Sequence, residues 1–457
     1  MLWEGICSLI RKRPWYFYKL FLWLLQGKAR FKAHLANTVN PDVEFLPYND
    51  PLINWLKQQR ALGAQLVLAT ATEERVARSI AKQVGLFDEV LATTEAVNLS
   101  SENKRDALVG RYGERGFEYV GNSQADLAVW ASASVIHVVS QKSGHILKRA
   151  EKLGTLGEVF QREQNNFGSL LRALRPYQWI KNTLIFVPLL ASHRFLELPL
   201  LSQGLLAFIT FSVCASSVYL LNDLVDLNND RQHPTKSHRA LAAGRLSIPY
   251  VALLIPILLT LSLGLSLWLL PLSFTLLLAL YFSLTLIYSI WLKQVAMLDV
   301  IALSMLYTLR VIAGALAMSL IITFWILAFC MFIFLSLAFL KRYSELKDLA
   351  GYGGSAPVGR GYLVSDFDLM ASLGGASGYL SVLVLALYIN DVATEKLYGS
   401  PEWMWLACPL LLFWLSRIWL LSHRGQVHED PVVFALRDSV SRWIGFLFLL
   451  TFALAAS

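Results

Sequence analysis

The stretch Asn222-Asp-Leu-Val-Asp-Leu-Asn-Asn-Asp230 lies at the end of a long apolar run from Leu200 to Leu221. Its aspartates, Asp223, Asp226 and Asp230, are spaced i, i+3 and i+7, so a helix would place all three carboxylates on one face. Crowded carboxylates repel one another unless a cation lies among them, and hard oxygen ligands favour Mg²⁺. We therefore expect a magnesium site. The alternative is a solvated polar loop capping a membrane helix, where acidic residues are costly and rarely without function.

A basic segment follows the aspartates directly. Guanidinium and ammonium groups bind phosphate oxygens through charge-assisted hydrogen bonds. We expect this segment to hold phosphate groups of a substrate beside the metal. Its cationic candidates are Arg231, Lys236, His238 and Arg239.

The composition indicates a membrane protein that carries a globular domain. Hydrophobic residues make up 56% of the 457 residues, and the mean hydropathy is +0.50. Apolar runs of membrane-spanning length dominate after Trp179, whereas residues up to about Gln161 mix charged and apolar side chains. The net charge of +8 fits an anionic membrane surface and phosphorylated substrates. No basic stripe with interleaved aromatics indicates nucleic-acid binding, and the four isolated cysteines fit a reducing compartment.

Nine membrane spans are expected, with the chemistry on the cytoplasmic side. Basic residues gather in the loops of one side, which the positive-inside rule places in the cytoplasm of an inner (plasma) membrane protein, together with the amino-terminal domain. The oligomeric state stays open, and a homo-oligomer is compatible with the sequence. The expected spans are about 180–192, 200–221, 249–267, 269–290, 298–318, 320–340, 368–389, 403–421 and 440–456.

The first 160 residues alternate helices and strands after an amphipathic, surface-lying helical start at 1–36. Such alternation predicts a parallel sheet with helices on its faces. A charged connector, 161–178, should lead to the membrane part. The strands are expected at 65–69, 89–92, 117–120 and 134–139, and the helices at 52–62, 73–84, 104–112 and 124–131.

The strand ends of this domain resemble the haloacid dehalogenase (HAD) phosphatase superfamily. Thr70, Lys104 and Asp126 match its phosphate-binding hydroxyl, charge-neutralising lysine and acidic metal motif, with Asn122 where an aspartate is usual. That family's nucleophile lies in an Asp-x-Asp-Gly-Thr stretch after the first strand, yet no aspartate precedes Asp42. The chain begins where the helical cap should start, so we expect either a start codon assigned too late or an inactive remnant. Without the nucleophile, no aspartyl-phosphate can form and this domain should hydrolyse no phosphate ester by that route.

The aspartate motif at the end of the second span resembles that of the UbiA superfamily of intramembrane prenyltransferases, over about 170–457. The resemblance implies an all-helical membrane domain, 179–457, in which the three aspartates and Asn222 bind Mg²⁺ and a diphosphate. It also implies that Lys181 contacts phosphate.

The segment after the sixth span distinguishes two branches of that family. Aromatic prenyltransferases carry a second aspartate-rich stretch there, whereas residues 341–348 read Lys-Arg-Tyr-Ser-Glu-Leu-Lys-Asp. A basic segment resembles the decaprenyl-phosphate phosphoribosyltransferases, and Asp430-Pro431 agrees with them. The resemblance implies transfer of 5-phosphoribose from phosphoribosyl diphosphate to a polyprenyl phosphate held by Lys341 and Arg342. The chain departs from it at Arg239-Ala240, where Arg-Pro is usual. Further candidates for substrate binding are Lys293, Asp299, Arg310 and Glu345.

Two other functions stay open. A UbiA-type prenyltransferase, moving a prenyl group from a prenyl diphosphate to an aromatic or other acceptor, would need the second acidic motif. A membrane scaffold or transporter without catalysis would not need three aspartates beside a basic segment.

Overall fold

The structure, a computed structural model, describes residues 2–12, 16–38, 43–94, 97–140, 144–161, 166–233, 235–351, 360–391, 398–427 and 430–456. The chain forms two compact units. Unit 1 comprises Met1–Ala173 and Leu220–Leu254, and unit 2 comprises Leu174–Tyr219 and Ile255–Ser457. Each unit is described by itself.

Unit 1 begins with three short helices where the sequence suggests one helical stretch. They are α1 (Leu2–Lys12), α2 (Phe17–Leu25) and α3 (Lys28–Thr38). Gly27 separates the last two with φ +96°, a backbone conformation that glycine adopts without steric cost. Leu9, Phe31 and Leu35 are buried together, so α1 and α3 pack through a small apolar core of their own.

The α/β alternation of unit 1 is confirmed, but its strands form two parallel sheets rather than one. One sheet pairs β1 with β2, and the other has the order β3-β4-β5. No strand was expected at β5, whose few apolar residues lie among glycine and charged residues. Parallel strands agree with an α/β domain, although they do not confirm the HAD assignment. The elements are α4 (Asp50–Ala61), β1 (Val67–Glu73), α5 (Glu74–Val84), β2 (Glu89–Thr93), α6 (Glu102–Tyr112), β3 (Tyr119–Gly121), η2 (Gln124–Asp126), α7 (Leu127–Ala131), β4 (Ile136–Ser140), α8 (His145–Ala150), β5 (Leu156–Gln161) and α9 (Phe167–Leu174).

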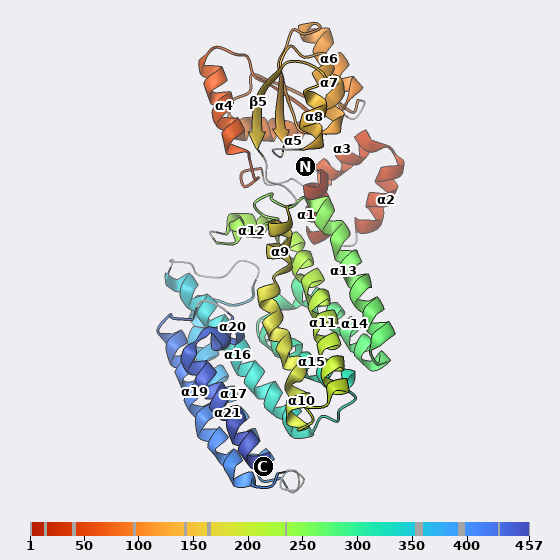
Figure 1. The fold of residues 1–457 in the computed structure, drawn as a ribbon. Coiled ribbons are helices and arrows are strands. Elements are labelled where there is room, and N and C mark those ends of the chain that lie inside the picture. The colour runs from red at the N-terminus through yellow and green to blue at the C-terminus, as the bar shows by residue number, and fades with distance from the viewer. Residues whose placement is uncertain are drawn as a thin grey trace. The chain divides into compact units, whose positions relative to one another are not determined.

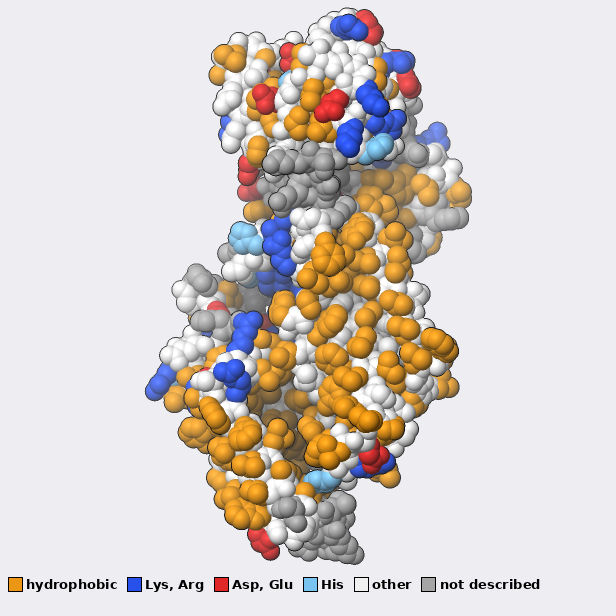
Figure 2. Space-filling model, in the orientation of Figure 1, with side chains coloured by type: hydrophobic (Ala, Val, Ile, Leu, Met, Phe, Trp, Pro, Cys, Tyr) orange, Lys and Arg blue, Asp and Glu red, His pale blue; other side chains and the backbone are white. Residues whose placement is uncertain are grey.

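Eight helices in the described part of the chain are long and apolar enough to cross a membrane. Figure 1 shows long helices of unit 2 running side by side, and hydrophobic side chains cover much of their surface in Figure 2. Such a surface is suited to lipid rather than water. The eight helices are α11 (Leu198–Val225), α13 (Ile248–Leu269), α14 (Leu272–Ile290), α15 (Leu298–Ala317), α16 (Phe324–Gly351), α17 (Phe367–Ile389), α19 (Ala407–His423) and α21 (Ser439–Ala456), and the spans of α17 and α19 begin in the preceding 3₁₀ turns, at Val364 and Pro401.

The ninth expected span, at 180–192, is not confirmed. This stretch forms a 3₁₀ helix, η3 (Pro176–Phe186), followed by the short α10 (Val187–Ala191). Pro188 lies in the first turn of α10, where its missing N–H is tolerated, whereas a continuous α-helix would lose a hydrogen bond there. The remaining short elements are α12 (Leu227–Gln232), η4 (Lys236–His238), η5 (Leu292–Gln294), η6 (Val364–Asp366), η7 (Pro401–Leu406) and α20 (Pro431–Arg437).

The basic segment 341–348, expected as a loop after the sixth span, is helical. α16 continues through it to Gly351. Its lysine, arginine, glutamate and leucine residues favour helix, and the i, i+3 pair Arg342–Glu345 lies on one side. The basic side chains are therefore held at the end of a helix.

Close packing against α15 positions the start of unit 2. A Cβ atom at Gly314 would overlap the backbone carbonyl of Ile185, so only glycine lets η3 approach α15 this closely. This approach places Lys181 and Asn182 of η3 beside the polar side chains of α15.

Candidate active site

The aspartate motif does not lie on one continuous helix. α11 ends at Val225 and α12 starts at Leu227, with Asp226 at the joint. Even so, two of the three carboxylates converge. Nη1 of Arg239 donates to Asp230 Oδ2 at 2.6 Å and to Asp223 Oδ1 at 3.3 Å. Both carboxylates are buried, with side-chain exposures of 5%.

The converging carboxylates fit a divalent cation. Two carboxylates that reach one positively charged atom can also share one metal ion, and Mg²⁺ prefers such oxygen ligands with substrate phosphates. Burial raises the pKa of Asp230, and the charge of Arg239 opposes that rise. A cation at this position therefore stabilises the ionised carboxylates. Among the described residues no three His, Cys, Asp or Glu side chains lie close enough together to bind one metal ion. Asp226 therefore does not join Asp223 and Asp230 in such a group.

The residues of the basic segment beside the motif differ in what they contact. Arg231 pairs with Glu4 of α1 at 2.7 and 3.0 Å and also donates to the carbonyl of Ala242. Asn228 donates to Ser8 of the same helix at 3.2 Å. The guanidinium of Arg231, expected to hold phosphate, instead fixes α1 to this segment. Of the other expected residues, Asn222 lies in the last turns of α11, and Lys236 is exposed in η4.

A first cluster of charged residues in unit 2 joins η3, α15, α16 and the start of α20. Lys181 Nζ donates to Asp430 Oδ2 at 2.6 Å, and Lys341 Nζ lies 3.4 Å from the same oxygen. The hydroxyl of Tyr307 donates to Asp430 Oδ1 at 2.9 Å. Burial alone raises the pKa of Asp430, but Lys181 and Lys341 outweigh burial and hold this pKa well below its usual value. Two lysine ammonium groups therefore share one carboxylate.

Arg310 links α15 to η3 and α14. Its Nε donates to Asn182 Oδ1 at 2.9 Å, and its Nη2 donates to the hydroxyl of Tyr281 at 3.2 Å. Its Nη1 donates to the carbonyl of Leu306. The guanidinium is buried and its donors are used within the protein, so its contribution at the site is positive charge and the placement of η3.

A second cluster surrounds Arg342, whose side chain is 1% exposed. Its guanidinium pairs with the carboxylates of Asp299 and Glu345 and donates to the hydroxyl of Tyr288 at 3.0 Å. Arg360 adds a second cation, 3.4 Å from Asp299 and 3.2 Å from Glu345. Arg342 therefore holds this cluster together, while Lys341, whose side chain is 28% exposed, is the more accessible cation of α16.

Residues 183–440 match the UbiA prenyltransferase family. The matched residues make up more than half of the chain. The chain belongs to this family. It is an intramembrane transferase whose helices cross the membrane several times.

Relatives cover both parts of this UbiA-family chain. Decaprenyl-phosphate phosphoribosyltransferase of Mycobacterium tuberculosis is 34% identical over 304 residues, which are 65% of this chain and 98% of that protein. The uncharacterized protein y4nM of Sinorhizobium fredii is 34% identical over 431 residues, 94% of this chain and 83% of that protein. A solved structure of a UbiA homolog from Archaeoglobus fulgidus, bound to GPP and Mg²⁺, covers 63% of this chain and 100% of its own, with a TM-score of 0.47 and 18% identity.

Three residues of the two clusters were not assigned to the site from the sequence, namely Asp430, Tyr307 and Tyr288. Asp430-Pro431 does carry a local signal, because an aspartate before proline is a good helix start, and Asp430 accepts from the N–H of Val432 at 3.2 Å. Its pairing with Lys181, 249 positions away, has no local signal. Lys293, which was assigned, lies in η5.

The HAD-like residues of unit 1 are brought together only in part. Lys104 Nζ donates to the hydroxyl of Tyr119 at 2.8 Å and to Asp126 Oδ1 at 3.2 Å, and all three side chains are buried. Thr70 donates to Thr72 at 3.1 Å within its own strand, and the N–H of Asn122 donates to Asp126. The lysine expected to neutralise a phosphate is thus neutralised by Asp126.

Proposed function

We propose that this UbiA-family chain transfers 5-phosphoribose from phosphoribosyl diphosphate to a polyprenyl phosphate, with Mg²⁺. The observation that carries the proposal is the surplus of positive charge in unit 2. Its two clusters, together with Arg310 beside Tyr307, contain five cations and three carboxylates. Such a surplus is suited to an anionic acceptor, and the 34% identity to a decaprenyl-phosphate phosphoribosyltransferase supports the same substrates. The cations are Lys181, Arg310, Lys341, Arg342 and Arg360, and the carboxylates are Asp299, Glu345 and Asp430.

Lys181 and Lys341 are assigned to the lipid phosphate. Both ammonium groups lie on one carboxylate oxygen of Asp430, so each can exchange part of that contact for a phosphate oxygen. Lysine presents a compact charge with several rotatable donors and can follow such an exchange. Arg342, with its donors directed to Asp299 and Glu345, positions α16 instead.

Asp223, Asp226 and Asp230 are assigned to Mg²⁺, with Asn222 beside them. Held by these residues, Mg²⁺ would supply positive charge that stabilises the departing pyrophosphate. Arg239, which lies between Asp223 and Asp230, keeps the two carboxylates close together. Lys236 of the same segment is assigned to the diphosphate, because its side chain is exposed.

The reaction is a substitution at the anomeric carbon of the ribose. An oxygen of the lipid phosphate forms the new bond to that carbon, and the bond from the carbon to pyrophosphate breaks. The attacking oxygen is already anionic, so the chain needs no general base. Its residues contribute by placing the acceptor oxygen and by stabilising charge.

The membrane arrangement belongs to the same proposal. The chain is assigned to the inner membrane, with the amino-terminal domain and the catalytic residues on the cytoplasmic side. The reason is that basic side chains collect in the connections on the side of the membrane where the catalytic residues lie. Phosphoribosyl diphosphate is a highly charged sugar that does not cross a bilayer by itself, so a cytoplasmic site gives it direct access.

Purified chain in detergent tests the choice of substrates. It should release pyrophosphate when phosphoribosyl diphosphate, a polyprenyl phosphate and Mg²⁺ are all present, and should need each of the three. A prenyl diphosphate with an aromatic acceptor should give no product. Transfer of the prenyl group without use of phosphoribosyl diphosphate would replace this proposal with the aromatic prenyltransferase function.

A further inference from the structure

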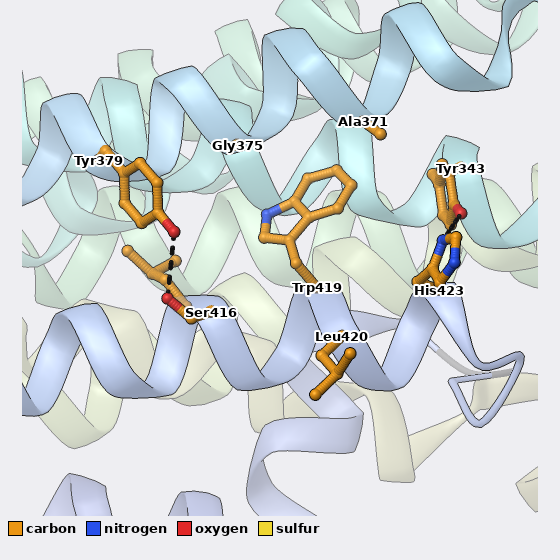
Figure 3. A pocket seen from close by; sticks show the side chains of 9 residues that line it. Tyr343, Ala371, Gly375, Tyr379, Ser416, Trp419, Leu420 and His423 are labelled. Atoms are coloured by element: carbon orange, nitrogen blue, oxygen red, sulfur yellow. Dashed lines mark hydrogen bonds between the residues drawn. The ribbon is translucent and has the colours of Figure 1, made fainter.

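A groove of about 330 Å³ opens between α16, α17 and α19 of unit 2. Figure 3 shows the side chains that line it. None of them belongs to the two charged clusters or to the aspartate motif. The catalytic proposal therefore leaves this groove without a role.

Each end of the groove is bounded by a hydrogen-bonded pair that joins two helices. At one end the hydroxyls of Tyr379 and Ser416 lie 3.1 Å apart, and at the other the hydroxyl of Tyr343 lies 2.9 Å from Nδ1 of His423. Ser416 and His423 are both on α19, so the distance between the ends is roughly 10 Å at 1.5 Å per residue. The polar tips of these side chains are satisfied by one another, which leaves the middle of the groove apolar (Figure 3).

The middle of the groove is shaped by Trp419 and by small residues of α17. The indole Nε1 of Trp419 donates to Ser336 of α16 at 3.2 Å, so its polar edge is used inside the bundle. A Cβ atom at Gly374 would overlap the Trp419 ring and lie 2.7 Å from Cβ of Phe339. A Cβ atom at Gly375, in contrast, would meet nothing within 4 Å, because it would point into open space in the groove.

The surroundings of the groove are apolar along its length and basic at the His423 end. α17 and α19 are helices of membrane-spanning length, and Tyr379 and Leu420 are about half exposed beside the groove, so hydrocarbon is the medium it meets. At the His423 end, Lys347 Nζ lies 5.9 Å from the centre of the Tyr343 ring, and the exposed Arg424 follows directly on α19.

A carboxylate of α17 also lies near Tyr343. Asp368, in the first turn of α17, interacts electrostatically with Tyr343. The two cations Lys347 and Arg424 at this end are complementary to the phosphate of an anionic lipid.

We propose that this groove binds one acyl chain of an anionic bilayer phospholipid, with the lipid phosphate at the His423 end. The apolar middle contacts the chain, and Lys347 and Arg424 contact the phosphate. The site is separate from the proposed transfer reaction, so it stands or falls by itself.

Photochemical labelling of the whole chain tests this proposal. The chain is reconstituted in phosphatidylcholine vesicles that contain phosphatidylglycerol with a diazirine on its acyl chain, and labelled peptides are mapped by mass spectrometry. Labels should lie within 371–379 and 415–420. Gly375→Leu fills the groove and should remove most of this labelling, whereas Gly445→Leu on α21, another glycine with open space around it, should leave it unchanged.

A comparison of lipid headgroups tests the phosphate contact without a substitution inside the groove. Labelling with phosphatidylglycerol should exceed that with a phosphatidylcholine probe, and Lys347→Gln with Arg424→Gln should lower this preference by about fivefold for each charge removed. Equal labelling by both lipids would overturn the phosphate contact. Displacement by polyprenyl phosphate at lower concentration than phosphatidylglycerol, or crosslinks from the groove to a second copy of the chain, would overturn the assigned occupant.

Discussion

At the scale of single residues, Asp223 is the most direct test of the metal assignment. Its carboxylate is buried and shares Arg239 with Asp230, so an amide in its place keeps the shape but removes a charged ligand. Asp223→Asn should lower transfer by about 100-fold or more, since a metal supplies several kcal/mol of charge stabilisation. It should also weaken Mn²⁺ binding measured by electron paramagnetic resonance. Asp106→Asn, at an exposed site of unit 1, is the matched control, and normal Mn²⁺ affinity in Asp223→Asn would remove Asp223 from the metal site.

Lys341 tests the assignment of the lipid phosphate. Lys341→Gln removes one of the two ammonium groups on Asp430 and should raise the KM for polyprenyl phosphate by about 10-fold or more, the factor for losing a charged hydrogen bond of ~1.5–3 kcal/mol. The KM for phosphoribosyl diphosphate should hardly change. Lys148→Gln, in unit 1, serves as control. An equal rise in both KM values would show that Lys341 supports the fold of the site and not the acceptor.

Residue types were more predictable from the sequence than their partners. The aspartates and the basic residues could be found because their types and spacing suit metal and phosphate chemistry. Arg231 and Arg342 were assigned to substrate, yet both are engaged with acidic side chains of the protein, Glu4 and Asp299. Those partners are distant in sequence, and a local pattern carries no information about which carboxylate a guanidinium will meet.

At the scale of elements, α1 supports the segment that follows the aspartates. The buried pair Glu4–Arg231 and the contact between Ser8 and Asn228 fix this helix there. Glu4→Gln leaves Arg231 buried without its ion partner, at a cost of about 3–5 kcal/mol. Hydrogen exchange should therefore quicken in peptides from 2–12 and 227–239. The exposed pair of Glu102 gives the control, and Glu102→Gln should leave exchange unchanged. Unaltered protection in Glu4→Gln would mean that α1 is held by its apolar core alone.

The Lys104–Asp126 pair makes the stability of unit 1 depend on pH. Burial alone raises the pKa of Asp126, but Lys104 and several hydrogen bonds outweigh burial and place it below the ordinary value of 3.8. The pair's contribution is therefore complete above the unfolded pKa and is lost as the pH falls through the folded pKa. Asp126→Asn should unfold at a lower temperature at neutral pH and lose less stability on acidification than the parent chain.

A double variant gives the control for that experiment. Lys104→Met with Asp126→Leu removes both charges and should recover much of the stability that Asp126→Asn loses, because no buried charge is left unpaired. If the double variant is as unstable as the single one, the pair's hydrogen bonds to neighbouring groups matter more than its charges.

Most elements could be predicted, and the errors have physical causes. The long apolar runs and the α/β alternation follow hydrophobic periodicity, which is the strongest signal in a sequence. The end of α16 was missed because charge was taken to indicate a loop, whereas lysine and glutamate are good helix formers. The expected span at 180–192 is not confirmed, because Pro188 would interrupt the hydrogen bonds of a continuous α-helix there.

At the scale of the whole molecule, the chain combines a UbiA-family membrane bundle with an α/β domain whose HAD-like residues are only partly assembled. The domain's lysine is paired with Asp126 rather than left for a phosphate. We therefore expect the whole chain to transfer phosphoribose and to leave the phosphate on its product. Release of inorganic phosphate from a phosphoribosyl lipid by this chain would contradict that expectation.

The mass of the lipid product tests the central claim most directly. The purified chain is incubated with Mg²⁺, phosphoribosyl diphosphate and a polyprenyl phosphate, and the extracted lipid is analysed by mass spectrometry. Our account predicts a polyprenyl phosphate that has gained one phosphoribosyl group, formed in step with pyrophosphate and absent with Asp223→Asn. A lipid of unchanged mass, or a prenylated aromatic acceptor made from prenyl diphosphate under the same conditions, would contradict it.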